Sequence, residues 1–159
     1  MNGKLLTSDQ LADVSADLHR RGLKLVVTNG CFDLLHVGHV RYLQAARALG
    51  DALAVGLNGD ASVRALKGES RPLNREADRA EVLAALGCVD YVAIFPEVRA
   101  TRFLERVRPA IYVKGGDYTP ETLDAEERAA LLTSGAEIRI IPFQPGYSTS
   151  SVIERMNCT

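Results

Sequence analysis

Short apolar runs alternate with segments of helical periodicity along almost the whole chain. Apolar runs of about five residues predict buried strands, whereas apolar residues spaced three and four apart predict helices with one buried face. The predicted strands are Lys24–Thr28, Ala52–Leu57, Tyr91–Phe95, Ala110–Val113 and Glu137–Ile141. The predicted helices are Ser8–Arg21, Gly38–Leu49, Arg75–Leu86, Thr101–Val107, Asp124–Ser134 and Ser150–Met156, and Asn58–Asn74 is expected to form a polar loop.

This alternation is typical of a parallel sheet, because parallel strands need long crossovers that are usually helical and right-handed. We therefore predict a Rossmann-like, doubly wound α/β fold with a five-stranded parallel sheet and helices on both faces. No repeat or linker marks a boundary, so residues 1–159 are expected to form one domain, with an N-terminal helix in 1–22 and the α/β core in 23–159. Ligands of such sheets bind beyond the carboxyl ends of the strands, so the loops there should carry the chemistry.

Composition and charge exclude several classes of protein. Hydrophobic residues make up 47% and charged residues 25% of the chain, and the net charge is -1. Without clustered positive charge, neither nucleic acid nor a membrane surface is expected as a partner. The lack of a long apolar run or a signal-peptide pattern predicts a cytoplasmic protein. The three cysteines, Cys31, Cys88 and Cys158, form no CxxC pair, so neither a disulfide framework nor a zinc site is predicted.

The loop after the first predicted strand contains two of the three histidines. His36 and His39 should lie on one face of the first turn of the next helix, beside its free backbone N–H groups and the positive end of its dipole. Gly38 between them leaves room for a bulky anion. The pattern predicts a phosphate site rather than a zinc site, which would need a third ligand, although the histidines could also be incidental surface residues. The fingerprint GxGxxG is absent, which disfavours a hydride-transfer cofactor.

Positively charged side chains are expected at the same edge of the sheet. Only four of the 19 basic residues are lysines, and Lys67 and Lys114 each precede a glycine in a loop that follows a strand. A compact, mobile ammonium can follow the charge on a transferring phosphate, although either lysine alone could be an ordinary solvated residue. Arg71 and Arg79 would extend the cationic lining, but Arg79 could equally be a surface ion-pair partner.

Two further segments have the composition of ligand-binding loops. Gly115 and Gly116 would let the backbone approach a flat ligand, and Asp117 could accept hydrogen bonds from a ribose or base; a turn with a capping aspartate is the alternative. Ser148–Ser150 place hydroxyl groups at the start of the last helix. These hydroxyls suit either helix capping or a phosphate tail, and capping is the commoner use of such residues taken alone.

Four segments in order, TNGCFDLLHVGH, LKGESRPLN, VKGGDY and PGYSTSSVI, resemble one known family. The first is similar to the HxGH signature of nucleotidyltransferases, and the set resembles the adenylyltransferase domain of bacterial ADP-heptose synthases from about Leu25 to Met156. The resemblance implies that His36 and His39 bind the phosphates of ATP and stabilise the leaving pyrophosphate, and that Lys67 lies near the sugar phosphate and the reacting α-phosphate. It further implies nucleotide binding by Asn29, Gly30, Cys31, Phe32, Gly38, Arg79, Lys114, Gly115, Gly116, Asp117, Ser148, Thr149 and Ser150, and substrate binding by Asp33, Lys67 and Arg71.

The implied reaction joins ATP and D-glycero-β-D-manno-heptose 1-phosphate to give ADP-heptose and pyrophosphate, by direct in-line attack on the α-phosphate. The product would supply heptose units of cell-surface glycans such as lipopolysaccharide. Mg²⁺ is expected to accompany ATP, and the sequence contains no dedicated metal-binding carboxylate set. The family also implies a homodimer. In its bifunctional members a sugar kinase domain precedes this one, and no kinase domain is expected here.

Two alternatives remain open on the sequence. CTP-dependent cytidylyltransferases that act on a small phosphorylated alcohol, such as glycerol 3-phosphate, share the first motif. They carry an Arg-Tyr pair where this chain has Gly87-Cys88, and an arginine where it has Phe143-Gln144. Both departures favour ATP. The other alternative is a nucleotide-binding regulatory module without turnover, against which the intact histidines and lysines count.

Overall fold

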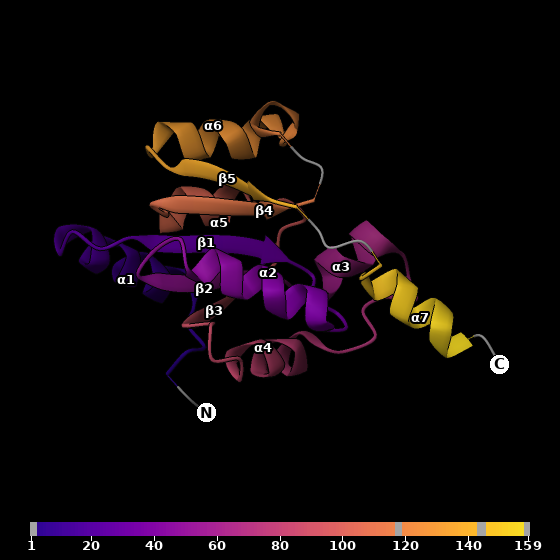
Figure 1. Ribbon diagram of the computed structural model, residues 1–159. Helices are drawn as coiled ribbons and strands as arrows, with labels where there is room; N and C mark the ends of the chain where they lie inside the picture. The colour runs from indigo at the N-terminus through magenta and orange to yellow at the C-terminus, as the bar shows by residue number, and fades with distance from the viewer. Residues whose placement is uncertain (1–2, 117–118, 143–145, 158–159) are drawn as a thin grey trace.

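The computed structural model describes residues 3–116, 119–142 and 146–157 (Figure 1). Five parallel strands form one sheet in the order β3-β2-β1-β4-β5. Their bounds are β1 Leu25–Gly30, β2 Ala52–Asn58, β3 Tyr91–Phe95, β4 Ile111–Gly115 and β5 Glu137–Ile141. The predicted fold class is therefore confirmed, and each predicted strand is present with an end shifted by no more than a few residues.

Helices cover both faces of the sheet, and two further helices lie beyond the carboxyl ends of the strands (Figure 1). The helices are α1 Ser8–Arg20, α2 Val37–Arg47, α3 Asp60–Lys67, α4 Glu76–Ala84, α5 Thr101–Val107, α6 Ala125–Thr133 and α7 Thr149–Asn157, with a 3-10 turn η1 at Pro120–Thr122. None of the helices in the described ranges is long and apolar enough to cross a membrane. In Figure 1, α3 and α7 lie beyond the arrowheads of the strands, where the predicted site residues follow the sheet.

Two hydrophobic clusters, one on each face, hold the helices to the sheet. One cluster packs α1, α5 and α6 through residues such as Leu11, Phe103 and Leu131. The other packs α2 and α4 through residues such as Leu43 and Leu83. The alternating side-chain directions of the strands supply both clusters at once, which is why the strands are almost wholly apolar. This double layer fixes the strand ends, and with them the loops that carry the candidate chemistry.

The strand order places the topological switch point between β1 and β4. The chain proceeds from β1 toward β2 and β3 on one side, and then crosses to β4 and β5 on the other. The connections that leave the carboxyl ends of β1 and β4 therefore diverge to opposite faces, and a crevice opens between them. The loop after β1 contains the histidine pair, and β4 ends at Lys114 and Gly115. The switch point thus coincides with the segments that the sequence singles out.

The prediction of a loop over Asn58–Asn74 is wrong in its first half, where the structure has helix α3. This helix has eight residues and buries only Ser62 and Val63, so its apolar periodicity is too short to be recognised in the sequence. Lys67 is accordingly the last residue of a helix rather than a loop residue. Lys114 and Gly115 are likewise the last residues of β4, not part of the following loop.

Candidate functional site

The predicted histidine pair lies together at the start of α2. His36 is the N-cap residue and His39 the third residue of the helix, and their rings stack with centroids 4.0 Å apart. The backbone N–H of His36 donates a hydrogen bond of 3.3 Å to Nδ1 of His39. Since Nδ1 accepts, the proton of a neutral His39 ring is on Nε2. The arrangement therefore leaves Nε2–H of His39 as a hydrogen-bond donor.

Both histidines are held neutral by their surroundings. Burial lowers the pKa of His39 to about 4, and the adjacent His36 adds to this shift. Burial also lowers the pKa of His36. Nδ1 of His36 is buried and has no hydrogen-bond partner within the described part of the chain. A buried polar atom without a partner at a helix N-terminus makes this a candidate ligand site.

The neutral state of His39 predicts a measurable loss of stability in acid. Between pH 6.5 and about 4 the unfolded chain binds more protons at this residue than the folded chain does. The free energy of unfolding should therefore fall as the pH falls through this window, by at most about 1.4 kcal/mol per pH unit from this group. Urea unfolding at pH 7, 6 and 5 should show a shallower dependence for His39→Gln than for the wild type. Equal slopes would contradict the buried neutral state.

The beginning of α7 packs directly against the histidine pair. The ring of Tyr147 stacks on His36 at 6.3 Å, and the Arg41 guanidinium lies 5.8 Å from the Tyr147 ring centroid. A Cβ atom added at Gly38 would come within 2.8 Å of both His36 Cε1 and Tyr147 Cβ. Gly38 is thus required for the close approach of these two segments. The sequence analysis missed Tyr147 and Arg41 as residues of this site. Tyr147 could have been noticed as an aromatic residue directly before the hydroxyl-rich segment.

Two hydroxyl groups of the segment Ser148–Ser150 form hydrogen bonds within the protein. The Ser148 hydroxyl accepts a hydrogen bond from the backbone N–H of Ser151, so it caps α7. The Thr149 hydroxyl donates to the backbone carbonyl of Leu34 at 3.1 Å and ties α7 to the loop after β1. Ser150 is exposed. The segment is therefore brought to the histidine pair, as a phosphate-binding role requires, but two of its three hydroxyls have partners within the protein.

On the other side of the β1 loop, Asp33 holds the segment that joins α3 to α4. Its side chain is 1% exposed and accepts hydrogen bonds from Arg71 Nε and from the backbone N–H groups of Leu73 and Asn74, all at 2.8–3.0 Å. Burial alone would raise the pKa of Asp33, but these hydrogen bonds and the Arg71 charge outweigh it, and the pKa is lowered. Asp33 is thus an ionised structural acceptor. Lys67, at the end of α3, is exposed.

Arg79 is expected from the sequence to extend the cationic lining or to be a surface ion-pair partner, but the structure buries its side chain and engages it fully. Only 1% of the side chain is exposed. Nη1 donates to the carbonyl oxygens of Cys31 and Asn58, both at 2.8 Å, and Nε donates to that of Asn74 at 2.9 Å. Nη2 pairs with the Asp60 carboxylate at 2.8 Å. Arg79 therefore joins four chain segments beneath the site and cannot face a nucleotide in this arrangement.

The nucleotide side of the predicted site lies at the ends of β1 and β4. The Asn29 side-chain oxygen is hydrogen-bonded by the Tyr112 hydroxyl. Lys114 is half-buried, and Gly115 is buried within the sheet. Gly116 has φ +105°, a conformation that side chains rarely adopt, and its N–H donates to the Ile141 carbonyl at 3.0 Å. Asp117 lies outside the described residues.

The loop after β1 folds its own aromatic residue against the site. Phe32 has φ +46°, and its ring centroid lies 5.3 Å from that of His39. A Cβ atom at Gly30 would come within 2.9 Å of the Phe32 ring, so this glycine makes the turn possible. Phe32 thereby contributes to the burial that keeps His39 neutral.

Cys31 is surrounded by positive charge and is nevertheless protonated. Burial raises the pKa of the Cys31 thiol, and the charges of Lys67, Arg79 and Arg71 oppose this shift without reversing it. A thiol rather than a thiolate is a poor nucleophile. Cys31→Ser should therefore keep most of the activity, and intact-protein mass spectrometry after incubation with ATP should detect no nucleotidyl adduct. Detection of such an adduct on Cys31 would exclude direct displacement.

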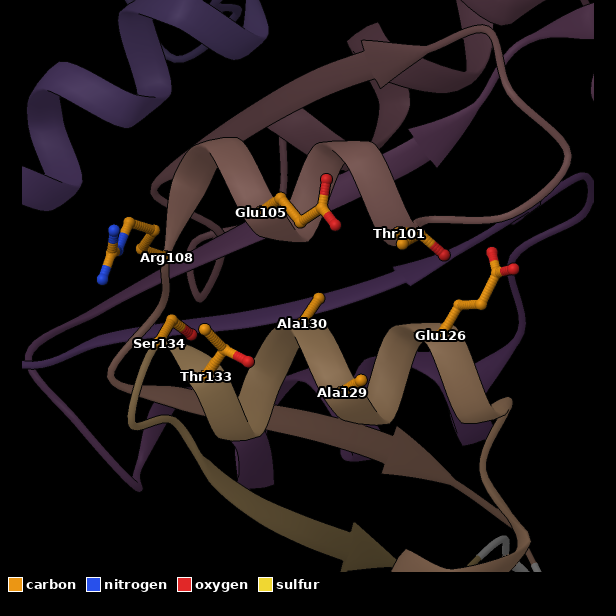
Figure 2. A pocket seen from close by; sticks show the side chains of 8 residues that line it. All are labelled: Thr101, Glu105, Arg108, Glu126, Ala129, Ala130, Thr133 and Ser134. Carbon is orange, nitrogen blue, oxygen red and sulfur yellow. The ribbon is translucent and has the colours of Figure 1, made fainter.

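Two further features bear on where ligands can bind. Among the described residues, no group of three His, Cys, Asp or Glu side chains is placed to hold a metal ion. A hollow of about 520 Å³ lies between α5 and α6 (Figure 2), lined by residues between Thr101 and Ser134. None of its lining residues belongs to the predicted site. The histidines and the Asp33–Arg71 pair therefore lie elsewhere, around the loop after β1.

The fold and the arrangement of this site agree with the family that the chain matches. Residues 27–155 match the family described as Cytidylyltransferase-like, and the chain belongs to that family. Over 155 residues it is 50% identical to the Bifunctional protein HldE of Geobacter metallireducens and 52% identical to that of Citrifermentans bemidjiense. Each alignment covers 98% of this chain and 31% of the relative, so the chain spans about a third of the length of these relatives.

Two solved structures share this fold. A lipopolysaccharide core biosynthesis protein from Thermoplasma volcanium superposes with a TM-score of 0.64 and 28% identity, over 77% of this chain and 98% of that one. A pantoate-beta-alanine ligase from Francisella tularensis superposes with a TM-score of 0.62 over 98% of this chain and 73% of that one. At 15% identity the second likeness concerns the fold alone.

Proposed function

We propose that this chain transfers the adenylyl group of ATP to D-glycero-β-D-manno-heptose 1-phosphate. The observation that carries the proposal is the stacked, neutral pair His36 and His39 at the N-terminus of α2, with Nε2–H of His39 left as a donor. Such donors suit a polyphosphate, which accepts hydrogen bonds and favours the positive end of a helix dipole. The identity of about 50% to proteins named Bifunctional protein HldE supports the same family of reactions.

The proposed reaction is a direct displacement at phosphorus. An oxygen of the sugar phosphate forms a bond to the α-phosphorus of ATP, and the bond to the oxygen that bridges to the β-phosphorus breaks and releases pyrophosphate. The nucleophile is already an anion, so no strong base is required. The histidine donors and the free N–H groups of α2 would stabilise the charge that builds on the leaving pyrophosphate. Mg²⁺ would enter with ATP and be held mainly by phosphate oxygens and water, because the described residues offer no three-ligand cluster.

Product analysis tests this proposal. The purified protein is incubated with ATP or CTP and, in separate reactions, with heptose 1-phosphate, heptose 7-phosphate, free heptose and glycerol 3-phosphate. Mass spectrometry should detect ADP-heptose from ATP with the 1-phosphate, and no product from the other sugars. CDP-glycerol from CTP would establish the cytidylyltransferase alternative. ATP binding without release of pyrophosphate from any acceptor would favour a regulatory module.

Lys67 is expected to act on the reacting phosphates as a mobile positive charge. Lys67→Ala should lower kcat/KM by about 10- to 100-fold, the size of a lost hydrogen bond between charged groups. Lys67→Arg should recover only part of this, because a planar guanidinium cannot follow a moving phosphate as an ammonium does. Lys24→Ala, at the opposite edge of the sheet, is the matched control and should behave as wild type. Full activity of Lys67→Arg would reduce Lys67 to a general source of charge.

A further inference from the structure

We propose that Arg71 binds the phosphate of the acceptor substrate, and that Asp33 is a positioning residue that orients the Arg71 guanidinium without touching substrate. The inference rests on the proposed function, since the acceptor there is a phosphorylated sugar. It keeps the expectation that Arg71 binds substrate, assigns Arg71 to the phosphate, and reverses the expectation that Asp33 itself binds substrate. Three features support the proposal. The Asp33 carboxylate already accepts hydrogen bonds from the protein at both oxygens, the Arg71 guanidinium is hydrogen-bonded only through Nε within the described ranges, and the segment that contains Arg71 is held in place by further hydrogen bonds.

The Asp33 carboxylate cannot itself bind a phosphate. Both of its oxygens accept hydrogen bonds from the protein, and the side chain is 1% exposed. Its lowered pKa keeps it ionised at neutral pH, so it would repel an anionic ligand. A buried carboxylate in this state can assist phosphate binding only through the cation that it holds.

Arg71 is held by one edge of its guanidinium. Nε donates to Asp33 Oδ2 at 2.8 Å, and no partner is described for Nη1 or Nη2 within the described ranges. The side chain is 16% exposed, so it is largely ordered by its surroundings but still reaches the surface. A guanidinium fixed at Nε presents its two Nη groups as a rigid pair of donors, which matches a phosphate in geometry and charge.

The segment that carries Arg71 is held at a second point. Asn74 donates its backbone N–H and its side-chain amide to Asp33, and its carbonyl accepts from the buried Arg79. The segment is therefore fixed to the β1 loop by Asp33 and to α4 by Arg79. The bond from Arg71 Nε to Asp33 places the guanidinium at the loop after β1. The histidine pair, by contrast, packs against Tyr147 of the α7 segment. The acceptor phosphate and the triphosphate would thus approach the same loop from different elements.

A double-mutant cycle tests the proposed coupling of Asp33 to Arg71. Pyrophosphate release is followed while ATP and heptose 1-phosphate are varied separately. Arg71→Ala should raise KM for the sugar phosphate by about 10- to 100-fold and leave KM for ATP within about twofold, because a charged hydrogen bond is lost at one substrate only. Asp33→Asn should raise the same KM, and it should add nothing in the Arg71→Ala background. Additive effects, or equal changes in both KM values, would overturn the proposal.

Two further measurements keep the test decisive. If the Asp33→Asn variant does not fold, the Arg71→Lys variant is measured in its place. Lysine keeps the positive charge but lacks the planar pair of donors, so KM for the sugar phosphate should remain raised. A wild-type KM for Arg71→Lys would overturn the proposal. Arg64→Ala is the matched control, since Arg64 is an exposed arginine of α3. If the wild type transfers nothing to heptose 1-phosphate, the proposed function fails by itself. The role of Arg71 is then decided by NMR titration with inorganic phosphate, in which an unmoved Arg71 Nε–H resonance would overturn it.

Discussion

Replacing His39 by alanine is expected to lower turnover by about 100- to 1,000-fold, the effect of removing one preorganised donor from a transition state. The expectation follows from the structure of the pair: the His36 N–H occupies Nδ1 of His39, burial keeps the ring neutral, and Nε2–H is left to donate. His36→Ala should have an effect of similar size, since it removes the stacked partner and the buried Nδ1. Steady-state pyrophosphate release measures both.

The matched variant for this prediction is His39→Gln. A glutamine amide can place an N–H close to the position of Nε2 but cannot become an acid in the working pH range. It should therefore recover part of the turnover that His39→Ala loses. ATP binding, measured by calorimetry, should fall much less than turnover in all three variants. Near-normal turnover of His39→Ala in a folded protein would refute the leaving-group role.

Removing the Arg79 side chain is expected to destabilise the fold by about 3–5 kcal/mol, the usual result of breaking a buried ion pair on one side. Arg79→Ala would leave the carbonyl oxygens of Cys31, Asn58 and Asn74 without their donor, and it would leave the Asp60 carboxylate without its partner. Arg79→Lys should recover only a fraction, because an ammonium cannot reach four acceptors around a plane.

Urea unfolding measures this loss of free energy. Arg75→Ala is the control: Arg75 is exposed, one turn earlier, and makes no side-chain cap hydrogen bond, so its loss should change stability by no more than about 0.5 kcal/mol. A change below about 1 kcal/mol for Arg79→Ala would show that the four contacts contribute little. Because Arg79 holds Cys31 of the loop after β1 and Asn74 of the segment bound to Asp33, folded Arg79 variants should also show reduced kcat/KM.

The sequence by itself determined the architecture and the loops in which the candidate site is predicted. Short apolar runs separated by helical periodicity specify a parallel sheet, and the position of each loop after its strand follows from the βαβ connection. His36 and His39 could be paired from their spacing alone, because helix geometry brings residues three apart to one face. The eight-residue helix α3 escaped prediction because it buries too few apolar positions to set up a period.

Only the tertiary structure decided what the charged residues do. The sequence predicts that Arg71, Arg79 and Lys67 all line the site with positive charge. In the structure Arg79 is buried among backbone carbonyls, Arg71 is held at one edge by Asp33, and Lys67 is exposed. The hydrogen-bond acceptors of Arg71 and Arg79 lie up to 48 residues away in the chain. The local sequence pattern contains no information about such distant partners. The same holds for Tyr147, which joins His36 only because α7 returns to the open edge of the sheet. Burial and long-range hydrogen bonding, which depend on how the elements pack, separate the cations that support the site from those that can meet a phosphate.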